Sequence, residues 1–413
     1  MRSLLVFGLI FGLFSCSKSG DTNLTNTLVL PINTHTVTLN LIADGKTNQA
    51  LPLQKVIDSC SLAGGGILIL PKGTYLIGPI YMKSKVTLQL DTLATLLASN
   101  NMNDFILGNK TLNIINGSND SNTAIQDVAI KGKGVIDGNG ATWWAAYNAD
   151  NTISRPRLVY IVNCTNLTLD GITLQNSPSF HFVPNLCKNV VASNLKIIAP
   201  STSPNTDGID PSNCQGVSIT NCIIDTGDDN IAIKCGRING VIGVGCQDLT
   251  VSNCLFLHGH GLSIGSETDN GIKNLTVTNC TFNGTTNGIR LKSLPGSGGI
   301  MQNLSYSDIT MTNVTNPIII TFSYNGNASY PTDIPSVNGI KIDHLTVTGS
   351  KNAGSLVGLI NSMLQNITLS NINISAQTGL VLTNGTNIIM SNYVINVKSG
   401  KSIIATNVTG SGF

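Results

Sequence analysis

The sequence is poor in charged and in aromatic side chains. Charged residues make up 11% of the 413 residues and aromatic residues 5%, whereas glycine occurs 42 times. This composition does not suit a helical protein. The net charge of +2 implies no overall attraction to nucleic acid or to an anionic membrane. Any preference for an acidic partner must therefore come from the local placement of charged residues.

The hydrophobic run at the N-terminus is too short to span a bilayer as a stable helix. It extends from Leu4 to Phe14, follows Arg2, and is typical of an export signal. Leu13-Phe14-Ser15-Cys16 resembles the lipobox of bacterial lipoproteins. The resemblance implies a signal peptide over residues 1–15, lipid attachment at Cys16 and a tether over residues 16–33. We expect an exported, membrane-anchored lipoprotein; ordinary secretion, in which Cys16 has no role, is the alternative.

The ten cysteines lack the spacing of a metal site, since no CxxC pattern occurs among them, and we expect no metal and no cofactor. Four cysteines follow an Asn at the end of a predicted strand: Cys164, Cys222, Cys254 and Cys280. They predict one repeated inward position and thus a ladder of buried thiols. Cys235 and Cys246 flank a Gly-rich loop and are candidates for a disulfide, which is common in exported chains.

Beyond the tether, short alternating strands recur at a loose but sustained spacing. Their apolar anchors are 21 to 36 residues apart. The anchors are Leu167, Val190, Val217, Leu249, Leu275, Leu304, Ile340, Ile367 and Ile388. Repeats of this size without intervening long helices indicate an all-β protein, a right-handed parallel β-helix (solenoid) over residues 34–413. A β-sandwich would need domain breaks that the chain lacks, and a propeller would need a longer period.

The N-terminal part of this domain fits a cap for the open end of the solenoid. Leu51 to Cys60 has helical spacing and precedes the strand Ile67 to Leu70, which predicts a short capping helix. The stretch Gly134 to Gly140 predicts a strand and a Gly-rich turn. We expect Trp143 and Trp144, which follow it, to close a coil rather than to stack on sugar.

Four polar clusters follow the repeat: Asn205-Thr206-Asp207, Gly227-Asp228-Asp229, Gly259-His260-Gly261 and Arg290-Leu291-Lys292. Asp228 lies six residues after Cys222, and His260 lies six after Cys254, so stacked coils would place the carboxylate and the imidazole one above the other. Each cluster alone is ordinary turn chemistry. Their shared register predicts a hydrolytic site where three acids, one His and two cations converge.

The order of these four clusters on a solenoid resembles the polygalacturonases, glycoside hydrolase family 28. The resemblance covers roughly Leu39 to the C-terminus. It implies that Asp228 is the general acid, that Asp207 and Asp229 hold and activate a water, and that the anomeric configuration inverts. It also implies that Asn205 contacts the substrate and that Tyr324 lies near the sugar on the leaving-group side.

The chemistry of the residues agrees with this implication. Glycoside hydrolysis needs one protonated carboxyl group and one ionised carboxylate. Neighbouring coils lie ~4.8 Å apart, so three close carboxylates should retain one proton near neutral pH, and His260 would tune the protonation of Asp228. Arg290 and Lys292 share a strand face and predict a pocket for a substrate carboxylate. Glu267 lines a subsite or merely ends a turn.

We therefore expect a hydrolase that cleaves α-1,4-galacturonosyl linkages of pectin, with an acidic polysaccharide such as galacturonan as partner. Whether it cleaves internally or from an end stays open. One alternative is a β-helix polysaccharide lyase, although lyases usually rely on a Ca²⁺ cluster and a basic Arg or Lys. The other is a non-catalytic solenoid adhesin.

Overall fold

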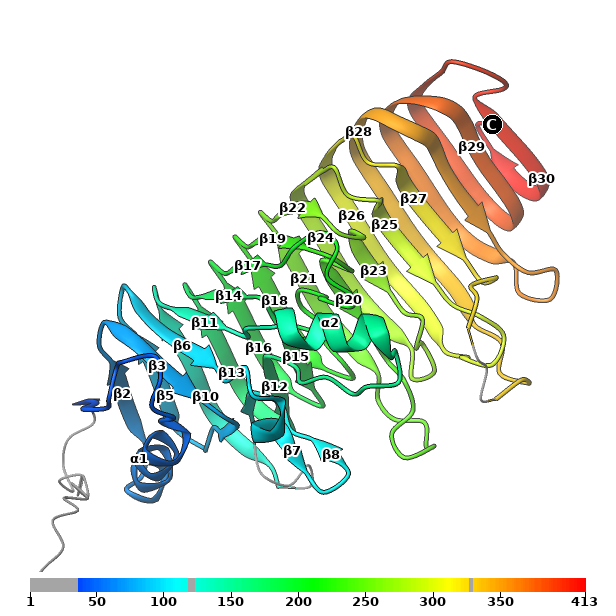
Figure 1. Cartoon of the computed structure of the whole chain (residues 1–413). Helices are drawn as coiled ribbons and strands as arrows, with labels where there is room; N and C mark the ends of the chain where they lie inside the picture. The colour runs from blue at the N-terminus through cyan, green and yellow to red at the C-terminus, as the bar shows by residue number, and fades with distance from the viewer. Residues whose placement is uncertain (1–35, 118–122, 327–329) are drawn as a thin grey trace, which may run out of the picture.

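The computed structural model describes residues 36–117, 123–326 and 330–413, which form a long coiled solenoid. Figure 1 shows the coils stacked from the blue N-terminal end to the red C-terminal end. Strands of neighbouring coils pair in parallel, and the coils wind in the right-handed sense usual for such connections. The predicted right-handed parallel β-helix is confirmed. The predicted signal peptide, Cys16 and tether lie outside the described residues.

Three ladders of parallel strands run along the solenoid. The first contains β1 (Thr36–Thr38), β2 (Gly66–Leu70), β5 (Val86–Leu90), β10 (Ile125–Gly132), β13 (Cys164–Asp170), β16 (Lys188–Ser193), β18 (Gln215–Thr220), β21 (Cys246–Ser252), β24 (Ile272–Asn283), β26 (Ile300–Thr312), β28 (Ser336–Val357) and β29 (Leu364–Val397). The second contains β3 (Gly73–Ile77), β6 (Ala94–Ala98), β11 (Val135–Asp137), β14 (Thr173–Gln175), β17 (Lys196–Ile198), β19 (Ile223–Thr226) and β22 (Leu255–His258).

The third ladder carries the polar clusters. It contains β4 (Ile80–Tyr81), β9 (Ile115–Asn116), β12 (Val159–Val162), β15 (Phe182–Asn185), β20 (Ile231–Ile233), β23 (Leu262–Ile264), β25 (Asn287–Lys292) and β27 (Asn316–Thr321). Strand β30 (Ile403–Ser411) pairs with Leu380 to Ile389 of β29. Isolated bridges at Ile209 and Ser212 join β15 to β20. A short 3-10 helix, Met102–Phe105, precedes the antiparallel hairpin of β7 (Ile106–Leu107) and β8 (Lys110–Thr111).

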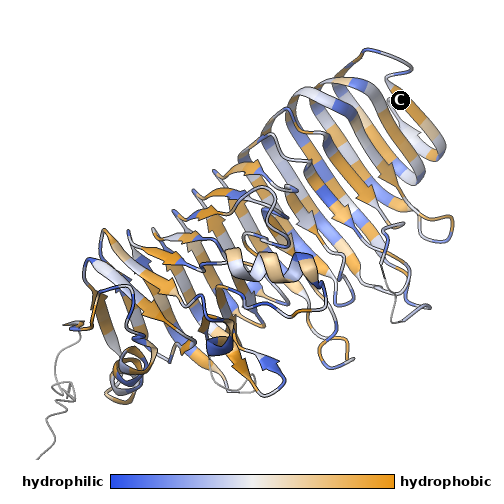
Figure 2. Cartoon of the chain, in the orientation of Figure 1, coloured by the Kyte–Doolittle hydropathy of each residue, from blue (hydrophilic) through white to orange (hydrophobic). Residues whose placement is uncertain are grey.

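Inward apolar side chains stack from coil to coil. Leu167, Val190, Val217, Leu249, Leu275, Leu304, Ile340 and Ile367 occupy one register position of the first ladder, and each is at most 2% exposed. Full burial of such a side chain contributes ~1.5–3 kcal/mol. Figure 2 shows apolar and polar residues alternating along the strands. This alternation turns every second side chain of the third ladder toward solvent, where the site forms.

Asn residues fill many corners of the coil. At such corners Asn166, Asn189, Asn253 and Asn279 adopt a left-handed backbone conformation, with φ between 51° and 61°. Asn tolerates this conformation better than other non-glycine residues. The amides also bond along the stack: Asn189 donates to Asn166 at 3.0 Å, and Asn279 donates to Asn253 at 2.7 Å. These requirements account for the Asn-rich composition.

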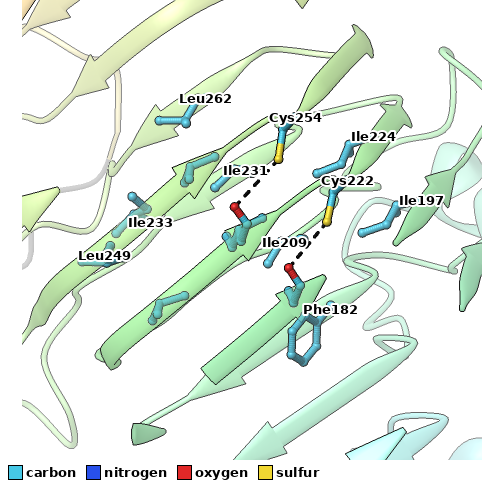
Figure 3. Close-up of a cluster of buried hydrophobic side chains, with 14 of the residues drawn as sticks. Phe182, Ile197, Ile209, Cys222, Ile224, Ile231, Ile233, Leu249, Cys254 and Leu262 are labelled. Carbon is cyan, nitrogen blue, oxygen red and sulfur yellow. Dashed lines mark hydrogen bonds between the residues drawn. The ribbon is translucent and has the colours of Figure 1, made fainter. Parts of the chain in front are cut away.

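The buried thiols occupy two columns rather than the predicted single one. Cys222, Cys254 and Cys280 stack in one column, and Figure 3 shows the first two pointing into the core beside Ile224 and Ile231. Cys164 lies in another column, of which Cys187, Cys214 and Cys246 are the further members. The nine cysteines of the described residues are all buried and free, so the predicted Cys235–Cys246 disulfide is wrong. Both side chains fill core positions as thiols.

Helices cover the solenoid at two places. Helix α1 (Ala50–Leu62) lies at the N-terminal end in Figure 1, buries Leu53, Val56 and Ile57, and confirms the predicted cap. Helix α2 (Ala141–Ala149) follows β11 where only a turn was expected. The Trp pair is structural as predicted: Trp143 packs edge-on against Phe105, and Trp144 donates to the Ser177 carbonyl at 3.0 Å. Among the described residues, no helix is long and apolar enough to cross a membrane.

Candidate active site

The polar clusters converge on the outer face of the third ladder. Ile209, Ile231 and Leu262 stack in the core at successive coils. Asp207, Asp229 and His260 each lie two residues before one of these isoleucine or leucine anchors. Because the anchors are in register, the polar residues that precede them stack as well. The predicted convergence of three acids with His260, Arg290 and Lys292 is thereby observed.

Asp228 and His260 form the pair that the equal six-residue offsets predicted. The Nδ1 of His260 lies 3.0 Å from Oδ1 of Asp228, and the His260 amide donates to the Asp228 carbonyl at 2.9 Å. Asn205 donates to Oδ2 of Asp228 at 3.3 Å. Burial alone would raise the pKa of the Asp228 carboxyl, but the hydrogen bond and charge of His260, the Asp229 amide and Lys292 lower it below its usual value.

Asp229 is the most tightly held of the three acids. It is 1% exposed, and its Oδ1 accepts hydrogen bonds from Ser263 at 2.9 Å and pairs with Arg290 Nη2 at 3.1 Å. Its Oδ2 accepts from Lys292 Nζ at 2.9 Å. Leu291 points into the core, as predicted, while the two cations face outward. Both cations are therefore paired with Asp229, and a substrate carboxylate that binds them would have to compete with Asp229.

Asp207 depends on partners that lie outside the predicted clusters. Its Oδ2 lies 3.8 Å from Lys234 Nζ, and the same ammonium lies 3.9 Å from Oδ2 of the fully buried Asp210. Oδ1 of Asp207 and both oxygens of Asp210 have no hydrogen-bond partner among the described residues. Burial raises the pKa of Asp207 well above its usual value, and Asp210 raises it further. Burial also raises the pKa of Asp210 to about 7.

Two further residues missed in the sequence hold the segment that carries Asn205 and Asp207. Arg155 stacks over the Tyr147 ring at 3.7 Å and donates to Asn205 Oδ1 at 2.7 Å. His181 lies beneath, with Nδ1 3.0 Å from the Asp207 carbonyl and Nε2 3.4 Å from the Ser177 amide. Burial lowers the pKa of His181 to about 4, so this imidazole is neutral and donates from Nδ1. No tripeptide marks these residues. His181 directly precedes strand β15, which was a usable signal, whereas Arg155 lies in a loop.

Tyr324 lies at the other end of the site. Its ring centroid is 5.4 Å from Lys292 Nζ, its amide donates to the Ser293 carbonyl, and the residue is 39% exposed. Tyr324 thus lies beside Lys292, while its contact with the sugar on the leaving-group side stays a prediction. On the opposite side, a groove of about 350 Å³ is lined by Arg157, Phe180, Asp210, Lys234 and Glu267. Glu267 therefore lines a groove, which favours a subsite over a simple turn.

A metal ion would have to compete with cations already in place. Within the part of the chain that the structure describes, Asp228, Asp229 and His260 are the group whose donor atoms lie within 4.8 Å of one another. Both oxygens of Asp229 are already paired with Arg290 and Lys292. Two nearby positive charges oppose the binding of a divalent cation. The arrangement instead suits proton transfer at Asp228 and anion binding at the two cations.

Acids paired with an imidazole and with cations on a parallel β-helix define a site suited to carbohydrate hydrolysis. The model of the glycosyl hydrolases family 28 matches residues 60–392, and the chain belongs to this family. An endo-polygalacturonase from Pectobacterium parmentieri is 35% identical over 343 residues, which cover 78% of this chain and 82% of that protein.

Further relatives agree in sequence and in structure. A probable polygalacturonase from Arabidopsis thaliana is 36% identical over 298 residues; the match covers 70% of this chain and 60% of that longer protein. The crystal structure of a hyperthermoactive exopolygalacturonase from Thermotoga maritima superposes with a TM-score of 0.75 at 27% identity, covering 86% of this chain and 91% of that one. Proteins named for endo action and for exo action are thus both among the relatives of this chain.

Proposed function

We propose that this protein hydrolyses the α-1,4-galacturonosyl linkages of polygalacturonate by an inverting acid/base mechanism. The observation that carries the proposal is the cluster of Asp207, Asp228 and Asp229 with His260, backed by Arg290 and Lys292, on one face of the solenoid. Membership of glycosyl hydrolases family 28 supports the same reaction. We expect no cofactor to take part.

In the proposed reaction Asp228 donates a proton to the leaving oxygen. The Nδ1 of His260 lies 3.0 Å from Oδ1 of Asp228, so the imidazole is placed to pass a proton to Asp228 for that transfer. Asp207 and Asp229 hold a water on the opposite side of the sugar, and one of them removes its proton as the water attacks the anomeric carbon. Attack by water without a covalent intermediate inverts the configuration.

Substrate recognition is assigned to the cations beside Asp229. Arg290 offers a planar pair of donors and Lys292 a point charge, both suited to a galacturonate carboxylate. Asn205 reaches Asp228 and is placed to contact the same sugar. Tyr324, within 5.4 Å of the Lys292 ammonium, offers a ring face on the leaving-group side.

The test is to incubate polygalacturonate with the protein, with and without a chelator, and to measure both reducing ends and ultraviolet absorbance. Hydrolysis produces reducing ends without new absorbance. A lyase would produce an unsaturated, absorbing product, and a non-catalytic adhesin would produce neither signal. Appearance of the absorbing product, or no reaction at all, would contradict the proposed function.

We also propose that the protein is an exported lipoprotein held to a membrane through Cys16. The proposal rests on the N-terminal sequence alone, where Leu13-Phe14-Ser15-Cys16 directly follows the short apolar run. Residues 16–33 would then serve as a tether between the lipid anchor and the solenoid. Secretion without an anchor is the alternative that the fractionation described below distinguishes.

A further inference from the structure

The three acids of the site are neutralised very unequally. Asp229 has Arg290, Lys292 and Ser263 as partners, and Asp228 has His260 and Asn205. For Asp207, Lys234 is the single ion-pair partner among the described residues, and its ammonium is also within 3.9 Å of Asp210. Four buried or half-buried carboxyl groups therefore meet three permanent cations, and the shortage falls on Asp207 and Asp210.

The backbone of the third ladder fixes the position of Lys234. Its amide donates to the Pro211 carbonyl at 2.9 Å, and its carbonyl accepts from the Asn213 amide at 3.0 Å. The side chain is 19% exposed, and its ammonium lies 5.1 Å from the Phe180 ring centroid. The ammonium is thus held between two acids of the neighbouring coil. While Asp210 is ionised, the Lys234 ammonium therefore neutralises the carboxylate of Asp207 only in part.

We propose that Lys234 is a positioning residue whose ammonium is shared between Asp207 and Asp210, and that this sharing sets the pH above which Asp207 works as the base. The proposal rests on the proposed function, because it takes Asp207 as a water-activating residue. In this scheme Lys234 favours the ionised form of Asp207, and ionised Asp210 disfavours it. The two residues act with opposite sign on the same proton.

The surrounding charges agree with these signs. Asp228, Asp229 and Glu267 add negative potential around the pair, and Arg155 adds positive potential near Asp207. Arg157 and Arg237 line the groove that Lys234 faces. Burial raises the pKa of Asp207 first of all, Asp210 raises it next, and Lys234 is the strongest group that lowers it. Removing either neighbour should therefore move this pKa in a predictable direction.

The test uses two variants with opposite expected signs. Lys234→Met removes the cation and should shift the acid limb of kcat/KM to higher pH by about one unit or more, the usual effect of one close opposite charge. Asp210→Asn removes the competing acid and should shift the same limb to lower pH. Lys234→Arg keeps the charge and should restore most of the wild-type profile. Substrate carboxyls titrate equally in every assay, so differences between variants report the enzyme.

A second readout does not depend on turnover. The infrared carboxyl band that Asp207→Asn removes from the spectrum identifies Asp207, and its titration gives the pKa in wild type and in both variants. A change in KM alone with an unchanged pH profile would make Lys234 a substrate-binding residue and overturn the proposal. Shifts of the acid limb in the same direction in Lys234→Met and Asp210→Asn would overturn it as well. If Lys234→Met fails to fold, Asp210→Asn decides the question. If the variants show the expected infrared shifts but the wild-type protein does not hydrolyse polygalacturonate, the result contradicts the proposed function instead.

Discussion

Replacing Asp228 by Asn removes the proposed proton donor while keeping the shape of the side chain. The amide oxygen of Asn can still accept the hydrogen bond that the Asp229 amide now gives to Oδ1 of Asp228 at 2.8 Å. It can also accept one from His260, which lies at 3.0 Å. The substitution should therefore keep the coil folded and remove proton donation, together with the hydrogen bond that Asn205 donates to Oδ2 of Asp228.

General acid catalysis typically contributes ~10²- to 10⁴-fold, so we expect the hydrolysis rate to fall by at least ~10²-fold, which corresponds to ~3 kcal/mol or more in the activation free energy. The assay is the release of reducing ends from polygalacturonate at saturating substrate. Circular dichroism and thermal unfolding show whether the variant is folded. An Asp228→Asn protein that is as fast as wild type would falsify the assignment of Asp228 as the acid.

The chain offers a matched control for this substitution. Asp225 pairs with His258 at 2.6 Å through the same Asp–His chemistry on the neighbouring strand, but both side chains are more exposed and lie outside the acid cluster. Asp225→Asn should leave the rate unchanged. Loss of activity in both variants would mean that the effect comes from disturbing the coil rather than from removing the proton donor.

The pH dependence of stability provides a separate check on Asp228. Its folded pKa is lowered, with burial opposed by the stronger effect of His260. A carboxyl whose folded pKa lies below its unfolded pKa stabilises the protein above the unfolded value, and this contribution is lost as pH falls. Asp228→Asn should therefore be less stable than wild type near pH 6, with the difference shrinking toward pH 3, as measured by thermal unfolding.

Three further outcomes are expected. Lys292→Ala should lower kcat/KM on polygalacturonate by a factor that corresponds to ~1.5–3 kcal/mol, the contribution of one charged hydrogen bond. The defect should shrink on methyl-esterified substrate. Equal defects on both substrates would make Lys292 structural. Burial lowers the pKa of His181 to about 4, so the neutral imidazole contributes its full stabilisation of the fold above the unfolded pKa of His. The free energy of unfolding should therefore fall by an amount on the order of 3 kcal/mol as the pH falls to 4. In His181→Gln the free energy of unfolding should lack this part of the pH dependence. Cys16→Ser should release the protein from membranes, or block its processing, at an unchanged catalytic rate; a soluble wild type with unmodified Cys16 in mass spectrometry would favour ordinary secretion.

Much of the fold was predictable because one physical requirement repeats along the chain. Each coil must place apolar side chains on those of the coil before it, so anchors such as Val217 and Leu249 recur at coil spacing and proved to be in register. The same regularity predicted that His260 would lie over Asp228. Ile224 and Phe256 pair between neighbouring coils, and Asp228 and His260 each follow four residues later. Where the site follows the register of the coils, sequence spacing fixes the geometry.

The Asn-Cys pattern shows where such reasoning went wrong. Asn163 and Asn221 both adopt left-handed φ values, 53° and 55°, because two different corners of the coil require that conformation. The dipeptide therefore marks a corner but does not say which one. Cys164 and Cys222 consequently fall in separate columns, although their local sequences are alike.

The charges that complete the site could not be placed from spacing. Arg155 meets Asn205 across 50 residues through a loop that follows α2, and the path of a loop is not encoded in the coil period. Lys234 directly follows β20 of the ladder, but its partner Asp210 lies in an irregular segment between β17 and β18. Strand alternation predicted the face on which Arg290 lies. The reach of its side chain to Asp229 depends on packing that alternation does not specify.

The pairing of Arg290 and Lys292 with Asp229 has a second consequence for the reaction. Arg290 and Lys292 both pair with Asp229, so a substrate carboxylate that binds them must compete with Asp229 for the same two charges. Weaker pairing would leave the negative charge of Asp229 less neutralised and so make Asp229 a stronger base toward water. Binding of an anionic sugar would then itself increase the reactivity of the site. A methyl ester cannot compete in this way, so wild type should show a higher kcat on the free acid than on the ester, and Lys292→Ala should narrow that difference.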